Sequence, residues 1–181
     1  RNVPAFLFER ERRVGDVVCD IAFGGNFYAL VPVDDVDPAR ADEYIRRGAE
    51  LMAAVNEDPP VHPEDPRIAG CRHVVFHAPG RDGADARNAT SIHPGWLDRS
   101  PCGTGTSARM AALHARGELA VGEPFVNESL LGTRFTGRLV AETTVGGLPA
   151  VVPEFTGRAW VTGTGTYVLD AEDPFPAGFA L

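Results

Sequence analysis

The sequence contains no lysine, because all 17 basic side chains among its 181 residues are arginine. Lysine forms the Schiff base with carbonyl substrates or pyridoxal phosphate, and it completes the phosphate-binding G-x-x-x-x-G-K-[ST] loop. Both chemistries are therefore excluded. Positive charge is also scarce overall, since 25 acidic residues give a formal net charge of -8. A nucleic acid or an acidic membrane would require a basic face. We expect a small-molecule partner, with no nucleic-acid and no membrane partner.

Cysteine and long apolar runs are scarce as well. The three cysteines, Cys19, Cys71 and Cys102, are odd in number and lack the C-x-x-C spacing of a zinc site. We therefore expect neither a disulfide framework nor a metal. No apolar run approaches the roughly 18 residues that span a bilayer, and no signal-peptide hydrophobic region follows Arg1. These absences predict a cytoplasmic protein. A chain that opens on Arg1 without an initiator methionine is interpreted as a fragment or a proteolytic product.

The composition is otherwise that of a globular domain with one buried core, since 44% of residues are hydrophobic and 23% are charged. We find no repeat or linker and treat residues 1–181 as a single domain. Clusters of β-branched and aromatic residues between turn formers predict strands. These strands are expected over residues 3–8, 17–22, 27–33, 73–76, 135–144, 150–155, 158–162 and 166–169.

Two helices are expected. The first begins after Asp37 as N-cap, with Pro38 at its first position, and its apolar residues recur at helical spacing through Val55, which predicts a surface helix. The second runs from Thr106 or Ser107 to about residue 115, and its small apolar residues on nearly every side predict a central helix. Residues 56–70 and 80–87 are rich in proline, glycine or polar residues and are interpreted as loops.

The segment from Asp98 to Arg109 carries the strongest chemical signal. It places Cys102, Gly103 and Thr104 just before the central helix, where free amides and the helix dipole form an anion site. A carboxylate could bind the amides of Gly103 and Thr104, and the same field favours a thiolate at Cys102. Asp98 could accept a hydrogen bond from a cationic amine of the same ligand. A lone cysteine is also commonly a small core residue, and the residues alone leave both interpretations open.

This segment closely resembles the second cysteine motif of the proline racemase family. The resemblance continues through other segments in the same order and covers essentially the whole chain. These segments are residues 2–6, 24–29, 62–64, 128–132, 157–160 and 173–179. It implies an α/β (α+β) fold, one lobe of the diaminopimelate-epimerase-like architecture, with mostly antiparallel strands curled around a central helix.

The resemblance also implies a cofactor-independent isomerase that acts on a proline-like amino acid. Two cysteines face opposite sides of the substrate α-carbon in this family, and Cys102 corresponds to one of them. Gly103 and Thr104 would hold the substrate carboxylate, and Asp98 would bind the ring nitrogen. The family's first half, with its own Cys-Gly-His-Gly type motif, is absent here, and Cys19 and Cys71 lie in no such motif. The missing N-terminal lobe is thus an expected partner, and the oligomeric state, a homodimer included, is left open.

Substrate choice depends on His73, which falls at a pocket position that is usually histidine in hydroxyproline epimerases. A buried ring hydroxyl needs a hydrogen-bond partner, and neutral imidazole can donate or accept. The alternative is that His73 opens a strand and faces solvent. Ile92 falls at another expected pocket position. The favoured parent activity is 4-hydroxyproline 2-epimerase, and the alternatives are trans-3-hydroxy-L-proline dehydratase, proline racemase, or a ligand-binding lobe that is inactive on its own.

Overall fold

The computed structural model describes residues 3–178, and over these residues most strands join one nine-stranded mixed sheet. Its main path runs β1-β2-β3-β6-β7-β9-β10-β11, and β8 pairs with β7. All pairs are antiparallel except β3–β6 and β7–β9, which are parallel. The strands are β1 (Phe6–Val14), β2 (Val17–Phe23), β3 (Phe27–Pro32), β6 (Cys71–Pro79), β7 (Ala86–Ile92), β8 (Trp96–Leu97), β9 (Pro124–Ser129), β10 (Arg134–Val145) and β11 (Leu148–Thr156).

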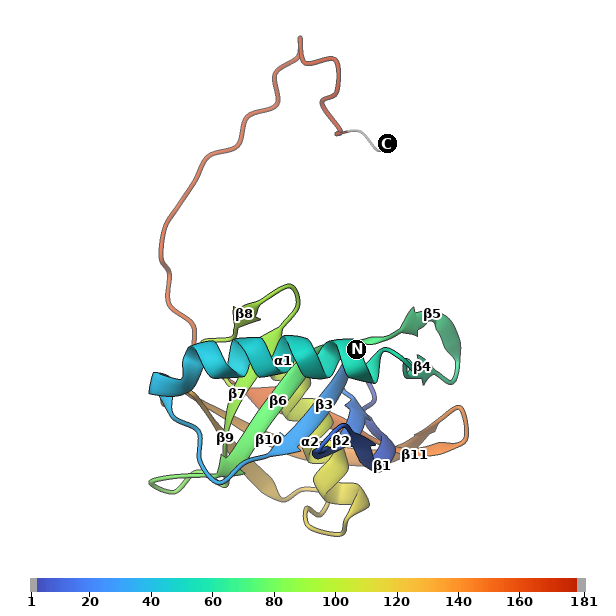
Figure 1. Ribbon diagram of the computed structural model, residues 1–181. Coiled ribbons are helices and arrows are strands. Elements are labelled where there is room, and N and C mark those ends of the chain that lie inside the picture. The colour runs from blue at the N-terminus through green and yellow to red at the C-terminus, as the bar shows by residue number, and fades with distance from the viewer. Residues whose placement is uncertain (1–2, 179–181) are drawn as a thin grey trace.

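The two edges of the sheet meet, so the sheet curls into a closed shape. Ala5, just before β1, exchanges two backbone hydrogen bonds of 2.8 Å with Val151 of β11. The helix α2 (Gly103–Ala115) runs inside the curl, while α1 (Ala41–Val55) crosses its outer face (Figure 1). This arrangement confirms the predicted fold class, in which mostly antiparallel strands curl around a central helix.

Side-chain alternation along the strands divides the core into an inner and an outer part. On β3, Tyr28 and Leu30 pack inward with Ala108 of α2, whereas Phe27 and Val31 belong to the outer core beneath α1. The central helix has the small residues this enclosure needs, and Ala108, Met110 and Ala112 are fully buried. The sequence had predicted this environment from the lack of a polar face.

The first helix also forms where the sequence predicted it. Asp37 accepts a 2.9 Å hydrogen bond from the Ala39 amide and caps a short 3-10 turn, η1 (Pro38–Arg40), which leads into α1. The apolar stripe that includes Tyr44, Leu51 and Val55 is buried against the sheet. The predicted surface helix is therefore confirmed.

Several details of the prediction were wrong. The helix α2 begins at Gly103, three residues earlier than expected, because Gly103 and Thr104 belong to its first turn. The strands β7 and β9 were missed, and the presumed loop over residues 56–70 contains a small hairpin of β4 (Val61–His62) and β5 (Asp65–Ala69). The two strands predicted over residues 158–162 and 166–169 do not form. That segment extends away from the sheet (Figure 1), where it has no neighbouring strand to supply hydrogen bonds.

Candidate active site

Cys102 is the N-cap residue of α2 and is only 6% exposed. Its backbone φ of 64° is in the left-handed region, which costs a non-glycine residue about 1–3 kcal/mol. Two hydrogen bonds hold this conformation: the Cys102 amide donates to Ser100 Oγ at 3.0 Å, and its carbonyl accepts from the Thr106 amide at 2.8 Å. The strained turn directs the sulfur into the interior of the curled sheet.

Three buried polar side chains clamp the peptide that precedes Cys102. The Pro101 carbonyl accepts hydrogen bonds from Asn88 Nδ2 at 3.2 Å, Asn127 Nδ2 at 3.3 Å and Thr106 Oγ1 at 3.1 Å. These residues come from β7, β9 and α2, so the clamp exists only after the sheet has curled around the helix. The sequence analysis missed both asparagines. Each is a polar residue in the middle of a strand, but the strands themselves were not predicted, so this signal could not be recognised.

Tyr28 and His73 lie beside Cys102 on the inner face of the sheet. The Tyr28 hydroxyl is 3.4 Å from Cys102 Sγ and 2.6 Å from Thr104 Oγ1. The His73 ring packs on the Tyr28 ring, with 4.7 Å between centroids. His73 Nδ1 is buried and has no hydrogen-bond partner within residues 3–178. Ile92 pairs directly opposite His73 across the β6–β7 ladder. The His73 side chain is thus partly buried and packs on Tyr28, the residue next to the sulfur.

The remaining predicted residues, Asp98, Gly103 and Thr104, lie near Cys102 in the chain, at the start of α2. Asp98 is half-buried; its carboxylate accepts a 2.8 Å hydrogen bond from the Ser100 amide, and its own amide donates to the Thr90 carbonyl at 2.9 Å. The amides of Gly103 and Thr104 lie in the first turn of α2, where a helix offers them no internal acceptor. They remain available to an anion in front of the helix.

The glycines around Cys102 are required by packing. A Cβ on Gly105 would lie 3.0 Å from Cys102 Sγ, and one on Gly103 would lie 2.5 Å from Phe155 Cζ. Across the site, a Cβ on Gly24 would overlap the Thr104 carbonyl and the Ala108 amide. The motif glycines therefore allow the β2–β3 turn, β11 and the start of α2 to approach one another closely.

Burial and hydrogen bonding act in opposite directions on the Cys102 thiol. Desolvation raises its pKa, and the charge of Asp98 raises it further, whereas hydrogen bonds from Tyr28, the Gly105 amide and the Thr104 side chain lower it. The net pKa lies above its ordinary value. The sequence predicted the opposite direction, because it considered the helix field without the desolvation. Burial also lowers the pKa of His73, so its imidazole is neutral at pH 7.

The other two cysteines lie apart from this site. Cys19 and Cys71 are both buried in the outer core, and burial raises the pKa of each thiol, that of Cys19 to about 11. Cys71 Sγ donates to the His73 carbonyl at 3.2 Å. Both thiols therefore have the environment of buried core side chains. Over residues 3–178, no group of three or more His, Cys, Asp or Glu side chains is arranged to hold a metal ion.

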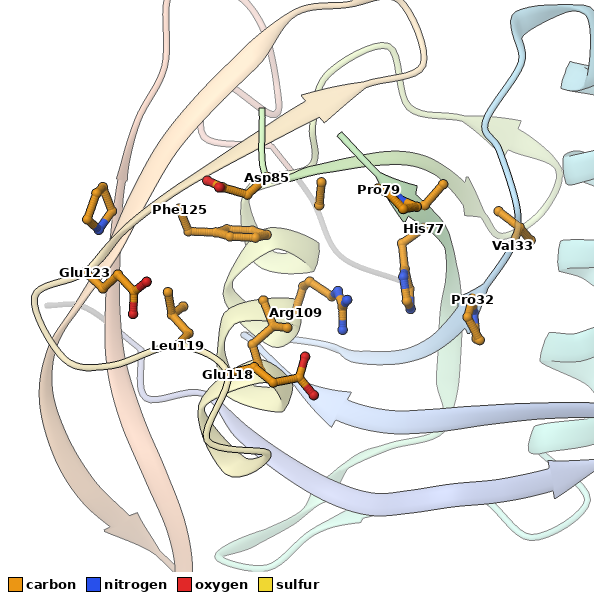
Figure 2. Close-up of a pocket in the computed structure, with 14 residues that line it drawn as sticks. Pro32, Val33, His77, Pro79, Asp85, Arg109, Glu118, Leu119, Glu123 and Phe125 are labelled. Atoms are coloured by element: carbon orange, nitrogen blue, oxygen red, sulfur yellow. The ribbon is translucent and has the colours of Figure 1, made fainter. Parts of the chain in front are cut away.

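A separate cavity of about 440 Å³ opens farther along α2 (Figure 2). Arg109 of α2 and His77 of β6 line it together with Glu118. Arg109 follows Cys102 by seven residues, which is about 10 Å along a helix. Three carboxylates, those of Asp85, Glu118 and Glu123, line the same cavity and outweigh the charge of Arg109. This cavity is therefore distinct from the thiol site and has no net positive charge to attract an anion.

Known proteins resemble this chain over nearly its whole length. A family model described as Proline racemase matches residues 1–180. A 4-hydroxyproline 2-epimerase from Streptosporangium roseum is 58% identical over 99% of this chain and 57% of that protein. A proline racemase from Clostridioides difficile is 41% identical over 99% of this chain and 57% of that protein.

A solved structure agrees with these sequence relatives. The hydroxyproline epimerase from Agrobacterium vitis, crystallised with bound trans-4-OH-L-proline, has a TM-score of 0.84 at 40% identity, and covers 99% of this chain and 55% of that one. The chain thus spans little more than half the length of the relatives it matches. Within the part of the chain that the structure describes, no helix is long and apolar enough to cross a membrane. The motifs, the curled sheet and these matches agree that the chain belongs to the proline racemase family.

Proposed function

We propose that this chain is the second lobe of a 4-hydroxyproline 2-epimerase, which interconverts trans-4-hydroxy-L-proline and cis-4-hydroxy-D-proline without a cofactor. The observation that carries the proposal is the corner formed by Cys102, the free amides at the start of α2, Asp98 and His73. The 58% identity to a protein named as this epimerase supports it. We also place the parent enzyme in the cytoplasm, because the three cysteines of this chain are all free thiols.

The proposed reaction moves one proton to a carbon and removes another. A thiolate takes the α-proton and becomes a thiol, while a thiol on the opposite face gives its proton to the α-carbon and becomes a thiolate. Cys102 is one of this pair, and the other belongs to the absent lobe. The amides of Gly103 and Thr104 bind the carboxylate, where negative charge develops as the carbon loses its proton. Asp98 holds the charged ring nitrogen. The raised pKa of Cys102 suits the thiol that delivers a proton.

His73 is proposed to recognise the ring hydroxyl. Its imidazole is neutral, and its Nδ1 is buried without a partner in residues 3–178. A buried polar atom left unpaired costs about 1–3 kcal/mol. A substrate hydroxyl that satisfies this nitrogen is therefore favoured over plain proline, which offers no such group. Ile92, across the ladder, supplies an apolar wall beside it.

The absent half of the enzyme is proposed to cover two exposed apolar surfaces. The first is the extended segment of residues 157–178 (Figure 1), where Val161 is 90% and Tyr167 99% exposed. The second is a groove of about 710 Å³ that includes Pro101, Leu131, Phe135 and Trp160. Exposed apolar area of this extent usually marks an interface. Because Pro101 precedes Cys102, a lobe docked in this groove would lie next to the thiol.

Chiral product analysis tests the proposal. The full-length protein is incubated with trans-4-hydroxy-L-proline, trans-3-hydroxy-L-proline or L-proline, and the products are separated on a chiral column. We expect the cis-4-hydroxy-D isomer as the fastest product and no turnover by Cys102→Ser. Loss of water from the 3-hydroxy substrate would indicate a dehydratase, and faster turnover of proline a racemase. Undiminished turnover by Cys102→Ser would remove Cys102 from the mechanism.

The same assay on the 181-residue chain tests the need for a second lobe. We expect binding without turnover, because the chain lacks the opposing thiol. Epimerisation by the isolated chain would contradict the two-cysteine mechanism.

A further inference from the structure

The Tyr28 hydroxyl bridges two groups of the site. It lies 3.4 Å from Cys102 Sγ and 2.6 Å from Thr104 Oγ1, and the residue is 1% exposed. Thr104 belongs to the turn whose amides face the proposed carboxylate, so the bridge joins the sulfur to the anion site. The tyrosine is presented by β3, a different element from the helix that carries both of its partners.

The chemistry of the Tyr28 hydroxyl, the Cys102 sulfur and the Thr104 hydroxyl limits which of them can donate a hydrogen bond. Burial, followed by the neighbouring charge of Cys102, raises the pKa of Tyr28 far above its usual value, so the phenol keeps its proton. A thiolate has no proton to donate. A hydrogen bond between Tyr28 and an ionised Cys102 therefore has Tyr28 as its donor, and the lone pairs of the phenol oxygen are then free to accept the Thr104 O–H. When Cys102 is a thiol, the Tyr28 proton is free to turn toward Thr104.

Close packing keeps these atoms in place. The Gly105 Cα leaves so little room that an added Cβ would lie 3.0 Å from Sγ and 3.3 Å from Tyr28 Cε1. The His73 ring also packs on the Tyr28 ring, with 4.7 Å between centroids. The remaining titratable neighbours are Asp98, whose charge opposes ionisation of Cys102, and the neutral His73.

We propose that Tyr28 is a positioning residue for Cys102, donating a hydrogen bond to the sulfur whenever Cys102 is a thiolate, with Thr104 donating to Tyr28 in turn. The inference rests on the proposed function, because proton exchange at the α-carbon requires Cys102 in both protonation states. Tyr28 would stabilise the thiolate in one direction of the reaction and release the thiol in the other. It touches the sulfur and is not itself expected to exchange a proton with substrate.

Thiol titration of the 181-residue chain tests this role without any need for turnover. The rate of Cys102 alkylation by iodoacetamide is followed from pH 7 to 10.5 by peptide mass spectrometry, which separates Cys102 from Cys19 and Cys71. We expect Tyr28→Phe to move the midpoint upward by about one pH unit, so that alkylation below the midpoint slows roughly tenfold. If the variant only changed the access of iodoacetamide to Cys102, the maximal alkylation rate at high pH would change while the midpoint stayed the same.

Two sets of variants make the result decisive. Tyr44→Phe is the matched control, because this buried tyrosine hydrogen-bonds only to the backbone of Asp35 and Asp37 among the described residues, away from Cys102. We expect the Cys102 midpoint in this variant to equal that of wild type. Thr104→Val should raise the midpoint by less than Tyr28→Phe, and Thr104→Ser should restore it. These two measure the whole effect of the Thr104 hydroxyl, its own side-chain hydrogen bond with Cys102 included, and they keep the proposal falsifiable if Tyr28→Phe unfolds.

An unchanged midpoint in a folded Tyr28→Phe would overturn the proposal, and so would equal midpoints in all the Thr104 variants. Failure of the proposed function looks different. If the full-length protein does not epimerise trans-4-hydroxy-L-proline while the midpoint still moves, Tyr28 keeps its role and the substrate assignment falls.

Discussion

At the residue scale, Cys102 is subject to two opposing effects on one sulfur. Its place before α2 exposes it to the helix field, which favours a thiolate. Its burial favours the thiol, and the net result raises the pKa. The place of Cys102 just before a helix could be predicted from the sequence, since it follows from the Cys-Gly-Thr-Gly pattern. Burial could not, because it depends on β3 and β11 closing over the turn.

His73 provides a test of substrate choice. His73→Ala should lower kcat/KM for trans-4-hydroxy-L-proline by about 10–100-fold in the full-length enzyme, since a lost hydrogen bond to a buried group costs about 1–3 kcal/mol. The loss with L-proline should be less than about threefold. Ile92→Val is the matched control, and it should affect both substrates alike. Equal losses in His73→Ala would show that this residue does not read the hydroxyl.

The lowered pKa of the buried His77 side chain predicts that stability depends on pH. Burial, with the charges of Arg109 and Arg116, lowers its pKa from 6.5 to about 3. The unfolded chain therefore binds a proton near pH 6.5 that the folded chain does not bind until about pH 3. Stability is complete above pH 6.5 and falls as the pH drops through that window, by about 2 kcal/mol at pH 5.

Urea unfolding at pH 7 and pH 5 measures this difference. His77→Asn should remove about 2 kcal/mol of the change between the two pH values. His93→Asn, at an exposed histidine, should leave it intact. A His77→Asn protein with the full wild-type dependence would mean that other groups cause the acid sensitivity.

At the element scale, the start of α2 is built by contacts that no local pattern contains. The turn between β2 and β3 lies against the helix so closely that Gly24 has no room for a side chain. The strands β7 and β9 were missed for the same reason, because their roles depend on contacts with distant residues. Their buried Asn88 and Asn127 look like loop residues in sequence, yet their amide groups bind the Pro101 carbonyl. Strands rich in aromatic and β-branched residues, such as β3, were predicted from their composition.

Gly24→Ala tests this close approach. Its Cβ would overlap the Thr104 carbonyl and lie 2.6 Å from the Ala108 amide, and neither backbone group can move away freely. We expect a loss of roughly 2–3 kcal/mol and a Tm lower by about 5–10 °C in calorimetry. Gly163→Ala is the matched control, because nothing lies within 4 Å of its added Cβ. A Tm equal to that of wild type in Gly24→Ala would refute the tight packing.

At the scale of the whole molecule, a closed sheet coexists with a segment that has nothing to pair with. The bridge between Ala5 and Val151 joins the sheet's edges, so the body offers no free edge there to residues 157–178. The strands predicted for this segment have β-forming residues but no partner within the described structure. Strand propensity becomes a strand only when another strand satisfies the backbone groups.

Limited proteolysis tests whether an absent lobe covers this segment. Arg158 is exposed and lies at the base of the extended segment. Trypsin should cut after it within minutes in the 181-residue chain and at least tenfold more slowly in the full-length protein. Arg13, which is exposed but paired with Val18 of β2, serves as the internal control and should resist in both. Equal cutting after Arg158 in the two proteins would contradict the proposed covering.

The sequence by itself determined the family, the central helix, and the positions of Cys102, Asp98, Gly103, Thr104 and His73 along the chain. Each of these depends on a local pattern, either a motif or the period of a helix or strand. The tertiary structure alone decided the direction of the Cys102 pKa, the clamp on Pro101 and the place of Tyr28 beside the sulfur. The physical reason is common to all three: desolvation and hydrogen bonds between distant strands exist only once the sheet has closed around α2.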